Sequence, residues 1–231
     1  MRYALLGIVF CVMSACAVYS QAEQKIRVHA GEDLMKAISD YGAYRFESFT
    51  TGMLFYKYRK NSTAKFNYHL LTGEMRFIDP GGDTLAIANP DQVSYINISG
   101  SLFYYDHGYL EVIADYDSLQ LAVQQKITVD YEKIGAYGQT NTSSAIDNNK
   151  TYSDRFNTYS LTINQDAVVR KNFRWFIVDE TGKSTAATKS NILKLFDAHK
   201  TEINDFIKTN DLKFNKEEDL KKLLRFCTGL H

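Results

Sequence analysis

Short segments in which apolar and polar residues alternate, separated by turn-forming residues, fill most of the chain after Gly42. In residues 64–70, Ala, Phe, Tyr and Leu share one face while Lys, Asn and His share the other, as in a strand with one buried side. Both prolines, Pro80 and Pro90, stand in turn sequences between such segments. We therefore expect an antiparallel meander. Its expected strands are 53–58, 64–70, 74–78, 84–88, 93–98, 102–105, 109–114, 119–130, 159–163, 173–178 and 184–187.

Residues 189–231 change to the helical period. A first helix is expected with Ser190 as its N-cap, and a second with Asn215 as N-cap and Glu218 three residues later. A short helix is also expected within 29–41. The predicted class is α+β, mainly β: a meander that forms a sandwich or a partly open barrel over residues 21–188, followed by two amphipathic helices packed on the sheet.

Residues 1–20 have the pattern of a signal peptide, because Met1 and Arg2 precede an apolar run from position 3 to 18. Cleavage before Gln21 is favoured, and cleavage after Ala22 is the alternative. A second alternative is a lipoprotein signal, because a lipobox-like sequence ends at Cys16, which would then be acylated. An uncleaved membrane anchor is disfavoured. The expected destination is the periplasm, the outer membrane or the medium, with no transmembrane span once the leader is removed.

Export changes the role of the three cysteines. Cys11 and Cys16 lie in the leader, so a chain beginning at Gln21 retains Cys227 alone and forms no internal disulfide. Cys227 follows Leu220, Leu223 and Leu224 at helical spacing, which favours a buried side chain over a nucleophile.

Composition and motifs exclude some functions. Equal numbers of basic and acidic residues, 27 of each, disfavour a general nucleic-acid binder. The run Ser62–Lys65 matches a serine acyl-enzyme pattern, but it falls at a hairpin turn and its companion motifs are missing. The histidines show no metal-ligand spacing. We therefore predict no catalytic residue, metal site or cofactor.

Two further features concern the surface. Residues 135–158 are polar and without period, which predicts a long loop that is either functional or a tolerated surface excursion. Thr84 and Ser118 each stand between Asp and Leu, in a tripeptide similar to the acceptor of O-glycosylation in exported proteins of the Bacteroidota.

Four runs carry a resemblance to a known group: KFNYHLLTGEMRFID at 65–79, GDTLA at 82–86, ATKSNILKLF at 187–196 and FNKEEDL at 214–220. They resemble a family of small, uncharacterised exported proteins of the Bacteroidota. The resemblance implies a Gram-negative, exported context and a sheet followed by C-terminal helices. It implies no ligand, activity or site residue.

Three functions remain open. The first is a non-enzymatic envelope module that binds a protein or a glycan through an exposed aromatic face of the sheet. The second is a carrier whose curved sheet encloses an apolar molecule or lipid, with the C-terminal helices as a lid. The third is an enzyme with a dispersed site. An apolar cavity under the sheet would favour the carrier. A solid core with a tyrosine patch on the surface would favour the binding module. A cleft that brings together His69, His107 and carboxylates would favour an enzyme. The candidate ligand or partner surface is Tyr56, Tyr58, Tyr104, Tyr105 and Tyr109.

Overall fold

The computed structural model describes residues 25–134, 140–144, 163 and 165–230. The strands are β1 (Lys25–Val28), β2 (Thr50–Tyr56), β3 (Ser62–His69), β4 (Glu74–Ile78), β5 (Thr84–Ala86), β6 (Val93–Ile98), β7 (Ser101–Tyr105), β8 (Tyr109–Asp115), β9 (Leu119–Ile134), β10 (Thr140–Ser144), β11 (Ala167–Asp179) and β12 (Ser184–Ala186). The α-helices are α1 (Leu34–Gly42), α2 (Lys189–Leu195), α3 (Lys200–Thr209) and α4 (Glu217–Thr228), and short 3-10 turns occur at Pro90–Gln92 and Asp197–His199.

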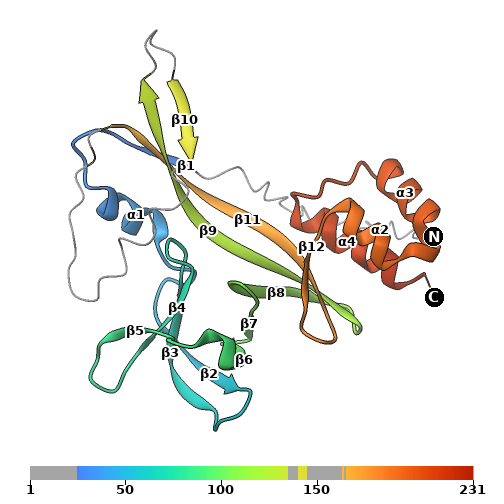
Figure 1. Ribbon diagram of the computed structural model, residues 1–231, viewed down its shortest axis with the longest axis horizontal. Helices are drawn as coiled ribbons and strands as arrows, with labels where there is room; N and C mark the ends of the chain where they lie inside the picture. The colour runs from blue at the N-terminus through green and yellow to red at the C-terminus, as the bar shows by residue number, and fades with distance from the viewer. Residues whose placement is uncertain (1–24, 135–139, 145–162, 164, 231) are drawn as a thin grey trace, which may run out of the picture.

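The strands of the described chain form one antiparallel sheet (Figure 1). Its order is β1-β11-β9-β8-β7-β6-β2-β3-β4-β5, while β10 pairs with β9 and β12 with β11 outside that path. The two ends of the path, β1 and β5, do not pair with each other, so the sheet is open. The predicted class, a mainly β meander followed by helices, is confirmed, and the sheet does not close into a barrel.

Local sequence explains the tight connections. The β6–β7 hairpin turns on Ser99 and Gly100, whose φ angles are 48° and 94°. Positive φ at both central residues is the geometry of the two-residue hairpin turn that matches strand twist. The Asn97 side chain also accepts a hydrogen bond from the Gly100 amide at 3.0 Å. This turn therefore fixes the register between β6 and β7.

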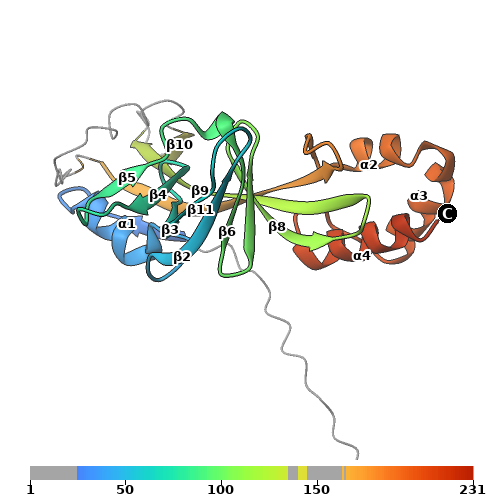
Figure 2. The same ribbon diagram turned by 90° about the horizontal axis from the view of Figure 1, so that it is seen from below.

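Two hydrophobic cores lie on the same face of the β9–β11 ribbon. In the first, α1 packs with Phe66, Tyr68 and Phe103 and with Ile127 of β9. In the second, the C-terminal helices pack on Val123 of β9 and on neighbouring side chains of β11. Side chains of one parity share a face of a strand, so positions 123 and 127 point the same way. Figure 2 shows α1 and α2–α4 at opposite ends of these strands. We call this the inner face of the sheet, and the opposite side the outer face.

The C-terminal helices differ from the prediction in detail. The first predicted helix is divided at Phe196 into α2 and α3, and the cap of α2 is Thr188, whose hydroxyl accepts the Asn191 amide, rather than Ser190. Helix α4 is capped at Lys216 rather than Asn215, with no side-chain cap bond among the described residues. Because no glycine or proline lies near Phe196, the helical spacing of apolar residues predicts one continuous helix through this position.

The predicted loop 135–158 is wrong in one part. Thr140–Ser144 form β10, which pairs antiparallel with the end of β9. These short polar residues carry no alternation of apolar side chains, so only the pairing with β9 identifies the strand. The rest of the predicted loop, the signal peptide at 1–20 with Cys16, and all of the predicted strand 159–163 except Ile163, lie outside the described residues.

Candidate functional site

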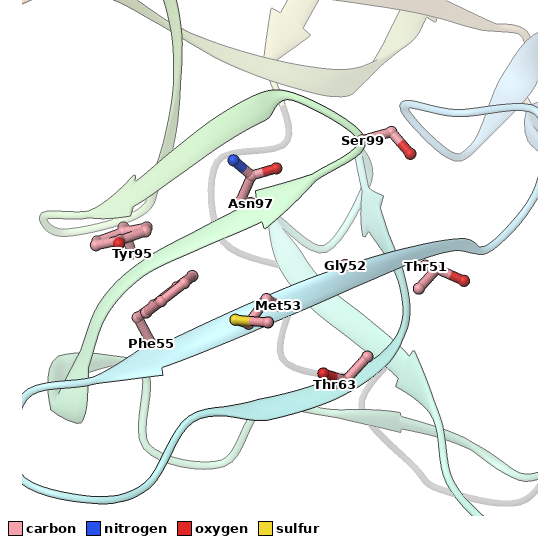
Figure 3. A pocket seen from close by; sticks show the side chains of 8 residues that line it. All are labelled: Thr51, Gly52, Met53, Phe55, Thr63, Tyr95, Asn97 and Ser99. Carbon is pink, nitrogen blue, oxygen red and sulfur yellow. The ribbon is translucent and has the colours of Figure 1, made fainter.

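A groove on the outer face of the sheet is the candidate binding site (Figure 3). Its volume is about 400 Å³. The side chains that line it are aromatic, thioether, hydroxyl and amide groups, and none of them is charged. We call this site the outer groove, defined by Thr51, Gly52, Met53, Phe55, Thr63, Tyr95, Asn97 and Ser99.

The alternation of β2 and its register with β6 build the groove. Leu54 is buried in the first core, so its neighbours Met53 and Phe55 point to the outer face. Across the ladder, Met53 stands opposite Asn97 and Phe55 opposite Tyr95. In Figure 3 the two rings lie at one end of the groove, while Thr51 and Ser99 lie at the other. The groove therefore runs from an aromatic end to a hydroxyl end.

The aromatic end continues across a third strand. The rings of Phe55 and Tyr95 stack with their centroids 4.2 Å apart, and Tyr95 meets Tyr104 of β7 edge to face at 6.3 Å. Burial raises the pKa of the Tyr104 hydroxyl above its ordinary value, although a hydrogen bond with Gln120 lowers it. Three rings thus follow one another across β2, β6 and β7. We call them the aromatic row.

The five predicted tyrosines do not form one surface. Tyr104 belongs to the aromatic row, and Tyr58 is 90% exposed in the turn after β2. Tyr56 and Tyr105 pack against the first core on the inner face. Tyr109 is only 4% exposed, so its expected place on an exposed face is wrong.

Tyr109 is instead a core residue. Its hydroxyl and that of Tyr68 have no hydrogen-bond partner in the described part of the chain, and the two rings are 5.9 Å apart. Burial raises the pKa of both hydroxyls, so they stay neutral. The sequence prediction includes none of the eight residues that line the outer groove, and among them it misses the two rings, Phe55 and Tyr95. Their parity relative to buried neighbours is the signal that could have identified them.

The histidines in the described part of the chain do not gather into a catalytic cleft. His69 is buried, its Nδ1 accepts the Thr72 amide at 3.2 Å, and Thr72 donates to Glu74 at 2.8 Å. His107 has a 99% exposed side chain near Asp106. Burial and, to a lesser degree, the Arg76 charge lower the pKa of His69 to about 4, although Glu74 acts in the opposite direction. The ring is therefore neutral at physiological pH.

The described residues also contain no cluster of three His, Cys, Asp or Glu side chains that could hold a metal ion.

The predicted O-glycosylation sites are Thr84 and Ser118. Both are exposed: Thr84 at the start of β5, and Ser118 in the turn before β9. Exposure makes them accessible, while their modification stays a prediction. None of the described helices has the length and apolar character needed to cross a membrane.

Comparison of the chain with protein-family models, with curated proteins and with solved structures finds no match. The resemblance to exported proteins of the Bacteroidota therefore stays a prediction, and the outer groove must be interpreted from its own chemistry.

Proposed function

We propose that this chain is an exported, non-enzymatic binding module of the cell envelope, and that its outer groove holds a neutral glycan. The observation that carries the proposal is the aromatic row beside uncharged hydrogen-bonding groups. Aromatic rings offer large apolar area at low entropy cost, and a few placed polar groups orient a ligand. A sugar ring has one apolar C–H face and a rim of hydroxyls, which matches both features.

The size and charge of the groove favour a glycan over a protein partner. A stable protein interface covers about 800 Å² on each partner and relies on buried aromatic and arginine anchors. The outer groove is a depression of about 400 Å³, which is within the size range of small-ligand sites, and no lining residue is charged. A neutral oligosaccharide would fill it without leaving a charge unpaired.

The inner face offers less to a lipid ligand. Large side chains such as Phe66, Tyr68 and Phe103 are each at most 2% exposed, and they share the first core with the buried residues of α1. An apolar molecule would have to displace this packed core, which costs several kcal/mol for each large side chain. The first core is therefore not where we place an apolar ligand.

Titration with neutral oligosaccharides tests the proposal. Binding of soluble β-glucan, xylan and mannan fragments to the chain beginning at Gln21 is followed by calorimetry. Tyr95→Ala removes one ring of the aromatic row, and Thr63→Arg places a charge in the groove from an exposed strand position. Each is expected to weaken binding about tenfold, which corresponds to about 1.4 kcal/mol. Tyr58→Ala, which removes a 90% exposed tyrosine outside the groove, is the matched control and should bind as the unmodified chain does.

Crosslinking in the native envelope provides the opposing outcome. The glycan proposal is wrong if no neutral oligosaccharide binds and a protein is instead crosslinked to the chain. If Tyr95→Ala abolishes that crosslink, the groove is a protein-binding site. Circular dichroism of each variant separates loss of binding from loss of folding. Intact-mass analysis of the same native material reports whether Cys16, Thr84 or Ser118 is modified.

A further inference from the structure

A second hollow lies between α2 and the end of the sheet where β9 begins and β11 ends. Its volume is about 500 Å³, within the range of small-molecule sites. We call it the helix-side cleft. The lining residues that matter here are four apolar and two basic ones, Leu119, Ile177, Leu195, Phe196, Lys183 and Lys194.

The apolar part of the cleft joins the second core to the surface. Leu119 and Ile177 are at most 5% exposed and form the base, while Leu195 at the end of α2 is 49% exposed. A single exposed leucine is ordinary on a protein surface. Here it faces a hollow lined by three other apolar side chains, and an apolar ligand placed there would be removed from water on several sides.

The basic part of the cleft carries two available cations. Lys183 lies in the turn between β11 and β12, and Lys194 lies in the last turn of α2. Across the part of the chain that the structure describes, neither ammonium lies within ion-pair distance of a carboxylate. Both side chains are exposed, so either can turn toward a ligand without breaking an existing pair.

One carboxylate, that of Asp179, also lines the cleft. Its Oδ1 accepts hydrogen bonds from the amide of Thr181 at 2.9 Å, the hydroxyl of Thr181 at 2.6 Å and the amide of Lys183 at 3.1 Å. These bonds hold the carboxylate in the turn after β11. The charge of Asp106 also interacts with Lys183, but its carboxylate does not line the cleft and accepts hydrogen bonds from the amide and the hydroxyl of Ser184. The lining side chains are therefore two lysines and one acid, a net positive set that favours a negative ligand.

We propose that the helix-side cleft binds a small amphipathic anion, an acyl chain that ends in a carboxylate. The acyl chain lies on Leu119, Ile177 and Leu195, and the carboxylate accepts charge-assisted hydrogen bonds from Lys183 and Lys194. This site lies on other strands than the outer groove, so the inference stands whether or not the groove binds a glycan.

Four probes with the same ten-carbon chain test the proposal by methyl NMR of the chain beginning at Gln21: decanoate, decyl phosphate, decanol and decyltrimethylammonium. Decanoate should shift the methyl resonances of Ile177 and Leu195 and bind about tenfold more tightly than decanol, because the head group adds about 1.4 kcal/mol. Tighter binding of decyl phosphate through the same lysines also supports the site and assigns the head group as a phosphate. Equal binding of decanoate, decanol and decyltrimethylammonium, or shifts confined to other methyl groups, overturns the proposal.

Variants separate the two parts of the site. Lys183→Gln combined with Lys194→Gln should reduce the affinity for decanoate to that for decanol, and Leu195→Gln should weaken both probes. Lys208→Gln, an exposed lysine of α3 that does not line the cleft, is the matched control. If the lysine pair and the control change decanoate binding equally, general charge attraction explains the result and the proposal fails.

Discussion

Arg45 holds the buried carboxylate of Glu111 with two hydrogen bonds, 2.7 Å from Nε to Oε2 and 2.9 Å from the second guanidinium nitrogen to Oε1. Gln125 donates a third bond to Oε2 at 2.9 Å. Gln125 stands on β9 between Val123 of the second core and Ile127 of the first. The ion pair thus lies between the two cores on the inner face, where Glu111 is only 5% exposed.

Arg45→Met is expected to destabilise the fold strongly. It leaves the Glu111 carboxylate buried with Gln125 as its remaining donor, and uncompensated buried charges of this kind cost about 3 kcal/mol. Urea denaturation followed by circular dichroism measures the loss. The double variant Arg45→Met with Glu111→Leu should recover most of it, because an apolar pair of similar volume needs no desolvation of charge. A single variant within about 0.5 kcal/mol of the unmodified chain would contradict this interpretation.

Stability should depend on pH through His69. Its pKa is about 4 in the folded chain, against an ordinary value of 6.5. Between these values the unfolded chain binds a proton that the folded chain does not, so the free energy of unfolding rises with pH. This stability is fully present above pH 6.5 and is lost as the pH falls toward 4. The expected loss is about 2 to 3 kcal/mol.

His69→Asn provides the comparison for that pH dependence. The Asn side chain can still accept the Thr72 amide but does not titrate in this range. Urea denaturation midpoints are measured from pH 4 to 7.5. They should rise more steeply with pH in the unmodified chain than in the variant. Parallel curves would show that His69 does not carry the effect.

Gly52→Ala should disrupt the pairing of β2 with β6. A Cβ at this position would lie 2.6 Å from the Asn97 carbonyl oxygen and 3.1 Å from the Phe66 ring. Overpacking of this kind typically lowers the free energy of unfolding by about 1 to 3 kcal/mol. Thermal denaturation of the variant and the unmodified chain measures this loss of stability. At Gly229 an added Cβ would meet its nearest neighbour at an ordinary 3.5 Å, so Gly229→Ala should change stability by less than about 0.5 kcal/mol. Equal effects of the two substitutions would show that the close approach at Gly52 is unimportant.

Cys227 should be unreactive in the folded chain. It is 1% exposed, and burial raises the pKa of its thiol to about 11, so almost no thiolate forms near neutral pH. In a chain beginning at Gln21, a thiol reagent at pH 8 should modify this single cysteine about a hundredfold more slowly before than after denaturation in urea. Comparable rates would contradict its place in the second core.

Local pattern predicts those parts of the fold that are determined locally. The strands at Glu74–Ile78 and Val93–Ile98 have their predicted bounds, because alternation and flanking turns mark both ends. Strand β11 begins at Ala167, earlier than predicted, since Arg170, Lys171 and Asn172 interrupt the apolar pattern. Pairing with β9 along its whole length supplies the missing stabilisation.

The candidate site depends on pairing between distant strands, which local pattern does not reveal. Tyr104 and Tyr105 are adjacent and therefore point to opposite faces, but the sequence alone does not say which face is covered. The stacking of Phe55 on Tyr95 depends on the register of β2 with β6. The helix-side cleft likewise arises where α2 meets the end of the sheet, between segments that are separate in sequence.

The position of β1 affects the order in which the chain can fold. Val28 pairs with Ala167 and Lys25 with Arg170, so the first described strand finds its partner only after more than half of the chain has followed it. A polypeptide emerging from the ribosome must therefore hold β1 unpaired, and the edge of β9 uncovered, until β11 is made. The first core therefore closes late in synthesis, because Ala167 and Val169 of β11 belong to it.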